Sequence, residues 1–257
     1  MAQITAVTFD LWQTLLLDNR ELGRTRAQVR LEGAQNALRK FGEAYELEQI
    51  RHAYRACYQQ CRRIREENRD VSFREQVEMF IENIATGLVE RLPQGVFQEI
   101  LTSYADSFFV YPPLPHEDAL TVLRRIKDMG LKIGLISNTG MTPGVAFRQF
   151  LDQHGMLRYF DALTFSDEVK LAKPSREIFE MTLSELGVTP GESIHVGDHV
   201  KNDVTGAKQI GMKTIWIEGF YEREDTSNPV SQPDATVSSL GKVVPAVLEL
   251  RGHEVSP

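Results

Sequence analysis

The chain has 257 residues, enough to bury a substantial core in one or two domains, and its 25% of charged residues is ordinary for a globular protein. Its formal net charge of −7 argues against nucleic acid as a partner. No charged-then-apolar leader precedes residue 20, and no apolar run is long enough to span a bilayer. We therefore expect a cytoplasmic protein that binds no membrane.

The first predicted strand, Ala6–Asp10, ends on a carboxylate, and Thr14 follows in the next turn. A carboxylate at the end of a buried strand is costly to place there for stability alone. Active sites of open α/β sheets collect at the carboxyl ends of strands. A turn or a helix cap is the ordinary alternative role for an aspartate. We expect Asp10 and Thr14 to belong to a functional site.

A helical segment follows, from residue 18 to residue 112. It contains no convincing strand, and its apolar residues keep helical spacing in four stripes, over residues 27–41, 47–64, 73–88 and 96–108. Ser72 and Glu75 form a capping box ahead of the third stripe. We predict a four-helix module inserted between the first and second strands. Short connections at its two ends would let it hinge over the strand ends as a lid.

Two groups of side chains in this segment have a functional and a structural interpretation. Cys57 and Cys61 lie four residues apart on one apolar stripe, but no other metal ligand accompanies them, so we predict two reduced, buried packing residues. Arg20, Arg24 and Arg26 lie close enough to the first connection to reach a substrate anion. We favour exposed helix arginines for these three.

Beyond residue 112, predicted strands alternate with helices. Strand-like runs occupy Lys132–Ser137, Ala162–Phe165, Ser193–Val196 and Lys213–Ile217. Helical patterns between the later runs end at Gly187 and Gly211, which can adopt the left-handed conformation that stops a helix. This alternation predicts an α/β fold, a doubly wound Rossmann-like parallel sheet with helices on both faces.

Three further polar groups follow these strands: Ser137-Asn138-Thr139, Lys173-Pro174 and Gly197-Asp198 with Asp203 downstream. Taken singly, Ser137 and Asn138 are typical helix caps, and Lys173 is typical of a surface lysine before a helix opened by the following proline. Asp198 and Asp203 are equally typical of a turn and of a helix start. In a parallel sheet, however, all these strand ends converge on one edge. We therefore expect them to join Asp10.

Together these groups resemble the haloacid dehalogenase superfamily, over nearly the whole chain. In that family the first motif reads Asp-x-Asp-x-Thr, the second is Ser or Thr, the third is Lys, and the fourth is Gly-Asp with a further Asp downstream. The corresponding residues are Asp10 with Thr14, Ser137, Lys173 and Gly197-Asp198 with Asp203. The helical segment resembles the family's α-helical cap. The resemblance implies a hydrolase with a catalytic core of residues 1–17 and 113–250, a cap of residues 18–112 and a tail of residues 251–257.

The resemblance also implies catalytic roles. Asp10 would be the nucleophile and would form a covalent aspartyl intermediate. Lys173 would supply positive charge and Ser137 a hydroxyl to the phosphoryl group. Thr14 and Asn138 would bind the substrate, a small phosphorylated molecule.

The metal site implied by the resemblance holds Mg²⁺. Its ligands would be Asp10, Asp198 and the backbone carbonyl of Trp12. Asp203 would be a supporting acid that orients Lys173 or metal-bound water.

Trp12 departs from the phosphatases of the family, which carry a carboxylate at this position to protonate the leaving group and later activate water. The indole N–H only donates a hydrogen bond and cannot shuttle a proton. Loss of a positioned acid/base typically costs about 10²–10⁴ in rate. Three hypotheses follow. The first is a magnesium-dependent phosphatase that is slow or limited to good leaving groups. The second is a 2-haloacid dehalogenase-like C–halogen hydrolase, and the third is a catalytically impaired protein that keeps the fold to bind a partner.

We favour the phosphatase, because a buried acidic pair without a cation is costly. C–halogen hydrolases of the family carry an aromatic residue at the position of Trp12 and release a halide that needs no proton. They usually lack the metal-binding Gly-Asp motif, which is intact here. Phosphonate-cleaving members use a cap lysine, and because Lys40 is the only lysine between residues 18 and 112 we discount that activity. A monomer and a homodimer are both compatible with the sequence.

Overall fold

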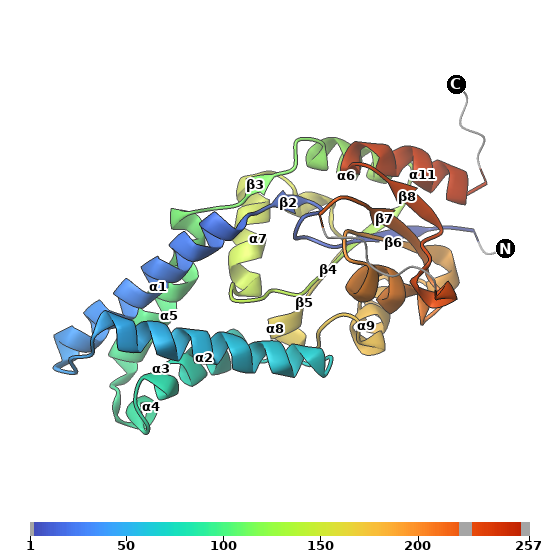
Figure 1. The fold of residues 1–257 in the computed structure, drawn as a ribbon. Coiled ribbons are helices and arrows are strands. Elements are labelled where there is room, and N and C mark those ends of the chain that lie inside the picture. The colour runs from blue at the N-terminus through green and yellow to red at the C-terminus, as the bar shows by residue number, and fades with distance from the viewer. Residues whose placement is uncertain (1–2, 221–227, 253–257) are drawn as a thin grey trace.

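The computed structural model describes residues 3–220 and 228–252, which form two lobes (Figure 1). One lobe is a sheet with helices on both faces, and α1 to α5 make up the other. The described strands are β1 (Ala6–Phe9), β2 (Leu16–Leu17), β3 (Leu114–Pro115), β4 (Lys132–Ser137), β5 (Ala162–Phe165), β6 (Ser193–Gly197), β7 (Lys213–Ile217) and β8 (Ala235–Val237). The described α-helices are α1 (Arg20–Phe41), α2 (Leu47–Glu66), α3 (Phe73–Ile84), α4 (Leu88–Arg91), α5 (Gln94–Val110), α6 (Ala119–Asp128), α7 (Gly144–Gln153), α8 (Ser166–Val169), α9 (Arg176–Leu186), α10 (Gly206–Lys208) and α11 (Val243–Leu250).

Six of the described strands form one parallel sheet in the order β5-β4-β1-β6-β7-β8. Five of them are the strands that the sequence predicts, to within one residue at each end. The sixth, β8, has three residues and is too short to show a pattern, and β2 pairs with β3 in an unpredicted two-residue antiparallel ribbon. Because β1 lies between β4 and β6, Asp10, the residue after β1, lies near the middle of the sheet's carboxyl edge.

Different helices cover the two faces of the sheet. On β1, Val7 and Phe9 belong to the core that packs beneath α6, α7 and α11, whereas Ala6 packs with α9 and α10. Figure 1 shows α6 and α11 on one side of the sheet and α9 on the other. This alternation follows from the two-residue period of a strand. The predicted doubly wound α/β fold is confirmed.

Five helices, α1 to α5, lie between residues 20 and 110, a range that the structure describes throughout. They bury an apolar core of their own. Four of them correspond to the four predicted helices. The prediction that the third continues to Leu88 is wrong: Ala85 is extended and Gly87 has a φ of 71°, so Leu88 starts the separate helix α4. The predicted domain limits stay a prediction, and residues 253–257 of the predicted tail lie outside the described residues.

The two cysteines of the helical lobe are structural. Cys57 and Cys61 are fully buried and free, as predicted. The Cys57 thiol donates a hydrogen bond to the Gln76 carbonyl (3.3 Å), so it serves as a small buried packing residue on α2.

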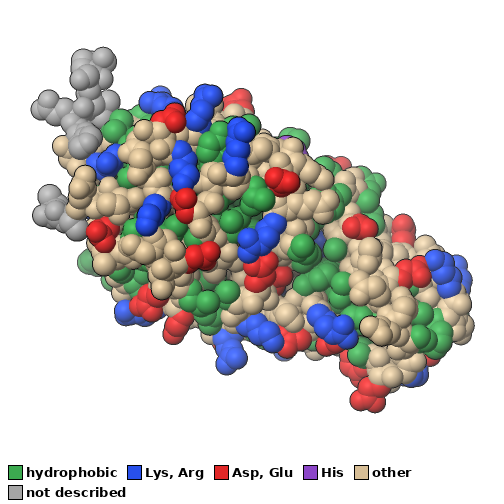
Figure 2. Space-filling view, turned by 180° about the vertical axis from the view of Figure 1, so that it is seen from behind, with side chains coloured by type: hydrophobic (Ala, Val, Ile, Leu, Met, Phe, Trp, Pro, Cys, Tyr) green, Lys and Arg blue, Asp and Glu red, His purple; other side chains and the backbone are tan. Residues whose placement is uncertain are grey.

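On the face drawn in Figure 2, basic and acidic side chains are interspersed over both lobes, and neither forms a separate patch. Among the described helices, none is both long enough and apolar enough to cross a bilayer.

The capping box at the start of α3 provides a first prediction. Ser72 Oγ accepts from the Glu75 N–H (3.3 Å), and the Glu75 carboxylate accepts from the Ser72 N–H (2.8 Å). We expect Ser72→Ala to lower the free energy of unfolding by about 1 kcal/mol, because α3 loses a cap. Urea denaturation measures this loss. Ser184→Ala, at an exposed position inside α9, is the control, and equal midpoints for the two variants would contradict the prediction.

Candidate active site

Acidic and basic side chains from distant parts of the chain meet at the end of β1. The Asp10 N–H extends the sheet by donating to the Val196 carbonyl (2.8 Å). The buried Asp10 side chain accepts a hydrogen bond at Oδ1 from Lys173 Nζ (2.5 Å), and the same ammonium donates to Asp203 Oδ1 (2.7 Å). The structure thus brings the first, third and fourth sequence motifs together, as predicted for a converging sheet edge.

Lys173 is held in place through its backbone. The Asn138 side chain, just beyond β4, accepts from the Lys173 N–H (2.8 Å) and donates to the Lys173 carbonyl (3.0 Å). Its amide oxygen and nitrogen therefore position the lysine, and the predicted contact of Asn138 with substrate stays a prediction. The expectation that Pro174 opens a helix is corrected: α9 begins at Arg176, because Ser175 before it is still non-helical and serves as the N-cap.

Asp203 lies in a π-helical turn, Val200–Thr205, that follows β6. Its Oδ1 is 3.2 Å from His195 Nε2, and His195 Nδ1 is 2.8 Å from Thr8 Oγ1. A buried chain of polar contacts therefore runs from Thr8 through His195 and Asp203 to Lys173. Neither His195 nor Thr8 is predicted from the sequence, although a histidine between two aliphatic residues of a central strand is a signal for a buried polar partner.

Gly197 makes room for this acid. A Cβ added at Gly197 would lie 2.3 Å from Asp203 Cγ, a distance that no side chain tolerates. Asp203 Oδ2 accepts from the His199 N–H (3.0 Å), which ties the turn to the end of β6. The glycine of the Gly-Asp motif is therefore required by the close approach of the second aspartate.

Burial and charge shift the pKa values of these groups in opposite directions. Burial raises the pKa of Asp10 to about 6 although Lys173 lowers it, and burial with the charges of Asp10 and Asp203 raises the pKa of Asp198 to about 9. Burial alone would lower the pKa of Lys173, but Asp10 and Asp203 raise it above its ordinary value. Burial alone would raise the pKa of Asp203, but Lys173 and His195 lower it overall. These shifts favour the charged forms of Lys173 and Asp203 and the protonated form of Asp198.

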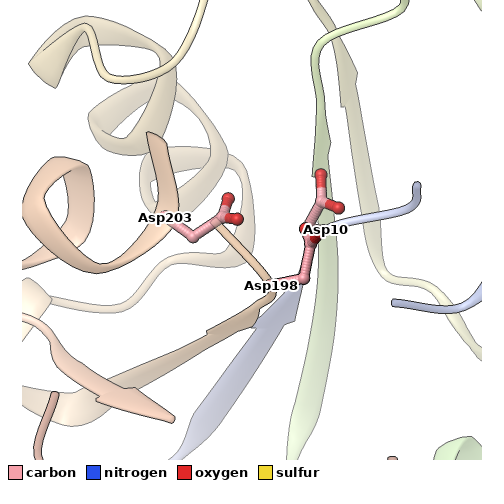
Figure 3. A group of neighbouring side chains, drawn as sticks. All are labelled: Asp10, Asp198 and Asp203. Carbon is pink, nitrogen blue, oxygen red and sulfur yellow. The ribbon is translucent and has the colours of Figure 1, made fainter. Parts of the chain in front are cut away.

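Asp10, Asp198 and Asp203 fit a divalent cation. Ligand oxygens of the three buried carboxylates lie within 4.8 Å of one another at the end of β1 (Figure 3). Within the described residues, Asp198 Oδ2 is buried and has no hydrogen-bond partner. Oxygen ligands are those that Mg²⁺ prefers. A buried acid with an unsatisfied oxygen beside two other carboxylates suits such an ion.

Two predicted hydroxyls are buried without a partner. Among the described residues, Ser137 Oγ and Thr14 Oγ1 are buried and make no hydrogen bond. Ser137 ends β4 next to β1, whereas Thr14 lines a separate cavity with Ile217 and His116. Their predicted roles toward the phosphoryl group and the substrate stay predictions.

Trp12 packs between the two lobes. Its half-buried ring makes edge-to-face contacts with Phe147 of α7 (5.2 Å between centroids) and Phe108 of α5 (6.3 Å). Trp12 lines a cavity of about 460 Å³, and Lys173 lines a second cavity of about 540 Å³. Tyr58 of α2 lines both cavities, so they adjoin where the helical lobe meets the sheet edge.

The expectation of three exposed arginines near the first connection is wrong for Arg26. Arg20 and Arg24 are exposed, but Arg26 is buried, pairs with Asp18 and donates to the Tyr111 carbonyl (3.0 Å). The sequence hides this role, because the carbonyl comes from the far end of the helical segment.

Residues 4–211, which carry all the side chains of this cluster, match the model of the family described as haloacid dehalogenase-like hydrolase. The chain belongs to this family of hydrolases. The glyceraldehyde 3-phosphate phosphatase of Methanopyrus kandleri is 31% identical over 153 residues, which are 58% of this chain and 63% of that relative. A HAD phosphatase of Thermococcus onnurineus superposes with a TM-score of 0.63 at 25% identity, over 95% of this chain and 98% of that one. The 2-haloacid dehalogenase of Pseudomonas syringae pv. Tomato DC3000 superposes with a TM-score of 0.69 at 19% identity, over 96% of this chain and 99% of that one.

These findings confirm the superfamily that the motifs indicate. At 19% identity, the likeness to the haloacid dehalogenase concerns the fold alone. The haloacid dehalogenase-like hydrolase described here therefore has the family's sheet and a cluster of motif residues at its carboxyl edge, with Trp12 two positions after Asp10.

Proposed function

We propose that this hydrolase is a magnesium-dependent phosphatase that acts on a small phosphorylated metabolite through an aspartyl-phosphate on Asp10. The observation that carries the proposal is the contact of Lys173 with both Asp10 and Asp203 beside the buried, unsatisfied Asp198. The names of the phosphatases from Methanopyrus kandleri and Thermococcus onnurineus support it. Cytoplasmic location and a monomeric or homodimeric state remain part of the proposal.

In the first half-reaction a carboxylate oxygen of Asp10 attacks phosphorus, and the bond from phosphorus to the leaving oxygen breaks. Lys173 holds the other Asp10 oxygen, which fixes the direction of attack, and its charge offsets that of the transferred group. In the second half-reaction water attacks the phosphorus of the aspartyl-phosphate, which releases inorganic phosphate and restores Asp10. Mg²⁺ held by Asp10, Asp198 and the Trp12 carbonyl would add positive charge beside the phosphoryl oxygens.

The contribution of Trp12 is tested by restoring an acid. We expect Trp12→Asp to raise kcat on alkyl phosphates by about 10²-fold, because a positioned carboxyl then protonates the leaving oxygen. Steady-state kinetics measure the change. Trp12→Asn is the matched control, since it makes the same cavity but transfers no proton, and an equal gain in both variants would assign the effect to space rather than to proton transfer.

Metal dependence tests the proposed function itself. With a panel of alkyl, aryl and acyl phosphates, we expect hydrolysis to stop in EDTA and to return when Mg²⁺ is added in excess. Phosphate release measures it. Hydrolysis that persists after dialysis against chelator, or the absence of hydrolysis on every ester with Mg²⁺ present, would contradict the proposal.

C–halogen hydrolysis is the second candidate, favoured by Trp12 alone. A halide leaves without a proton, so an aromatic residue at this position costs that reaction nothing. Chloride release from 2-chloropropionate in the presence of EDTA would support this reaction over phosphate ester hydrolysis.

A further inference from the structure

The cavity beside Trp12 has a strongly basic wall. It lies between α1, α2 and the loop after β4, and its lining includes four arginines, Arg20, Arg24, Arg26 and Arg30, against the single acid Asp18. The chain as a whole carries a net charge of −7, so the sign of the charge at this cavity is opposite to that of the whole chain. The cavity is therefore suited to an anion.

Arg30 is the unusual member of this wall. Its side chain is buried, and its hydrogen bonds go to neutral groups: Ser107 Oγ (2.8 Å), the Tyr104 carbonyl (3.4 Å), Tyr54 Oη (2.9 Å) and Thr142 Oγ1 (3.1 Å). Within residues 3–220 and 228–252, no carboxylate forms an ion pair with it. A buried charge is ordinarily paired, and removing one from water without a counter-ion is costly.

Arg30 differs from the neighbouring buried Arg26 in its partners. Arg26, one turn earlier on α1 and equally buried, has its carboxylate in Asp18. Arg30 instead lies over the ring of Tyr104 (4.5 Å to the centroid), and the nearby charge of Asp18 acts on it without forming an ion pair. A guanidinium has five N–H groups in a rigid fork. The bonds of Arg30 occupy its Nε–H and one hydrogen on each terminal nitrogen, which leaves one further N–H on each terminal nitrogen for an oxyanion.

Arg30 lies away from the proposed site of the transferred phosphoryl group. That group is placed by Asp10 and Lys173, and Lys173 lines the neighbouring cavity, whereas Arg30 lines the one beside Trp12. The two cavities share Tyr58 in their lining, so they are neighbours. A ligand long enough to span both would meet a cation at each end, Lys173 in one cavity and Arg30 in the other.

We propose that Arg30 binds a second oxyanion of the substrate, a carboxylate or a second phosphate, so that the preferred substrates are short phosphate monoesters that carry another anionic group. This inference rests on the proposed phosphatase function and specifies its substrate class. The fork of Arg30 takes the distal oxyanion. Arg20 and Arg24, exposed on α1, lie at the same cavity and draw the anion toward it. Tyr54 and Trp12 form the wall along the carbon chain.

The substrate preference is tested with matched pairs of esters. The first pair is 3-phosphoglycerate and glycerol 3-phosphate, which differ by a carboxylate in place of a hydroxymethyl group. The second pair is fructose 1,6-bisphosphate and fructose 6-phosphate, which tests a second phosphate. We expect kcat/KM to be about 10–100-fold higher for the doubly anionic member of at least one pair, with the difference mainly in KM. Equal kcat/KM within both pairs would overturn the proposal.

The arginine itself is tested with two variants. We expect Arg30→Met to abolish the preference and to lower kcat/KM for the doubly anionic ester much more than for glycerol 3-phosphate, since only the former uses the distal contact. The variant also loses the hydrogen bonds of Arg30 to α2, α5 and the loop after β4, so circular dichroism checks its fold. Arg30→Lys keeps the charge and loses the fork, and we expect it to weaken the preference. It replaces Arg30→Met in this test if the methionine variant does not fold. Arg39→Met, at an exposed position on the same helix, is the control and should keep the preference. An equal loss on both esters in a folded Arg30 variant would show a structural role only.

Ligand binding separates this inference from the proposed function. D-glycerate carries the carboxylate without a phosphate, and ligand-observed NMR detects its binding without turnover. The unaltered protein could bind D-glycerate, lose this binding in Arg30→Met and yet hydrolyse no phosphate ester. That result would retain the oxyanion site and reject the proposed phosphatase function. Equal kcat/KM for the two esters of each pair, together with no D-glycerate binding, would retain the phosphatase function and reject the oxyanion site.

Discussion

Asp10→Asn is expected to lower kcat/KM for phosphate esters by about 10⁴-fold or more, because an amide cannot attack phosphorus and the neighbouring Asp198 and Asp203 have other proposed roles. The change is nearly isosteric, and the amide oxygen can still accept a hydrogen bond from Lys173 Nζ. The loss should therefore appear in activity and not in folding. Steady-state kinetics and circular dichroism together measure this.

The covalent intermediate gives this prediction a second readout. Incubation of the unaltered protein with acetyl phosphate and Mg²⁺ should give a phosphoryl adduct that peptide mass spectrometry maps to Asp10. Asp152→Asn, at an exposed position on α7, should keep both the adduct and the activity. An Asp10→Asn protein that still turns over phosphate esters, or an adduct mapped to another residue, would remove Asp10 from the chemistry.

The parallel sheet could be predicted from the sequence because its strands are buried on both faces. Runs such as Ile133 to Ile136 are continuously apolar, and a glycine ends the helix that precedes β6. β8 could not be predicted, since three residues carry no period. The break between α3 and α4 was hidden for the opposite reason: apolar spacing continues through it, although the extended Ala85 and the left-handed Gly87 interrupt the helix.

The candidate site was predictable as far as its motif residues and no further. Asp10, Lys173, Asp198 and Asp203 converge because parallel strands end at one edge. The residues that surround them act across long sequence distances. Arg30 is an example: its partners on α2 and α5 and in the loop after β4 can be identified only once the helices are packed.

Lys173→Met is expected to destabilise the protein as well as inactivate it. The ammonium lies between two buried carboxylates, and its removal leaves Asp10 and Asp203 uncompensated. Breaking a buried ion pair in this way typically costs about 3–5 kcal/mol of unfolding free energy. We expect a loss of that order in EDTA at pH 8, together with a fall in kcat of about 10²–10³-fold in Mg²⁺, since the charge beside the phosphoryl group is gone.

The pH dependence of this loss identifies its cause. Burial raises the pKa values of Asp10 and Asp203 and Lys173 lowers them, so removal of the lysine leaves these acids with higher pKa values in the folded variant. A raised folded-state pKa costs stability above the ordinary carboxyl range, and the cost falls as the acids take up protons at lower pH. The difference between unaltered protein and Lys173→Met should therefore be larger at pH 8 than at pH 4. Urea denaturation at the two pH values measures it. Lys170→Met removes an exposed lysine paired with Glu75 and should cost less than about 1 kcal/mol at either pH.

A double variant separates stability from chemistry. Lys173→Met with Asp203→Asn removes one of the two stranded charges, so it should be more stable at pH 8 than Lys173→Met alone and just as inactive. If Lys173→Met proved as stable as Lys170→Met at pH 8, the buried ammonium would not be what compensates these acids. The convergence of charge at the end of β1, on which the proposed chemistry depends, would then have to be given up.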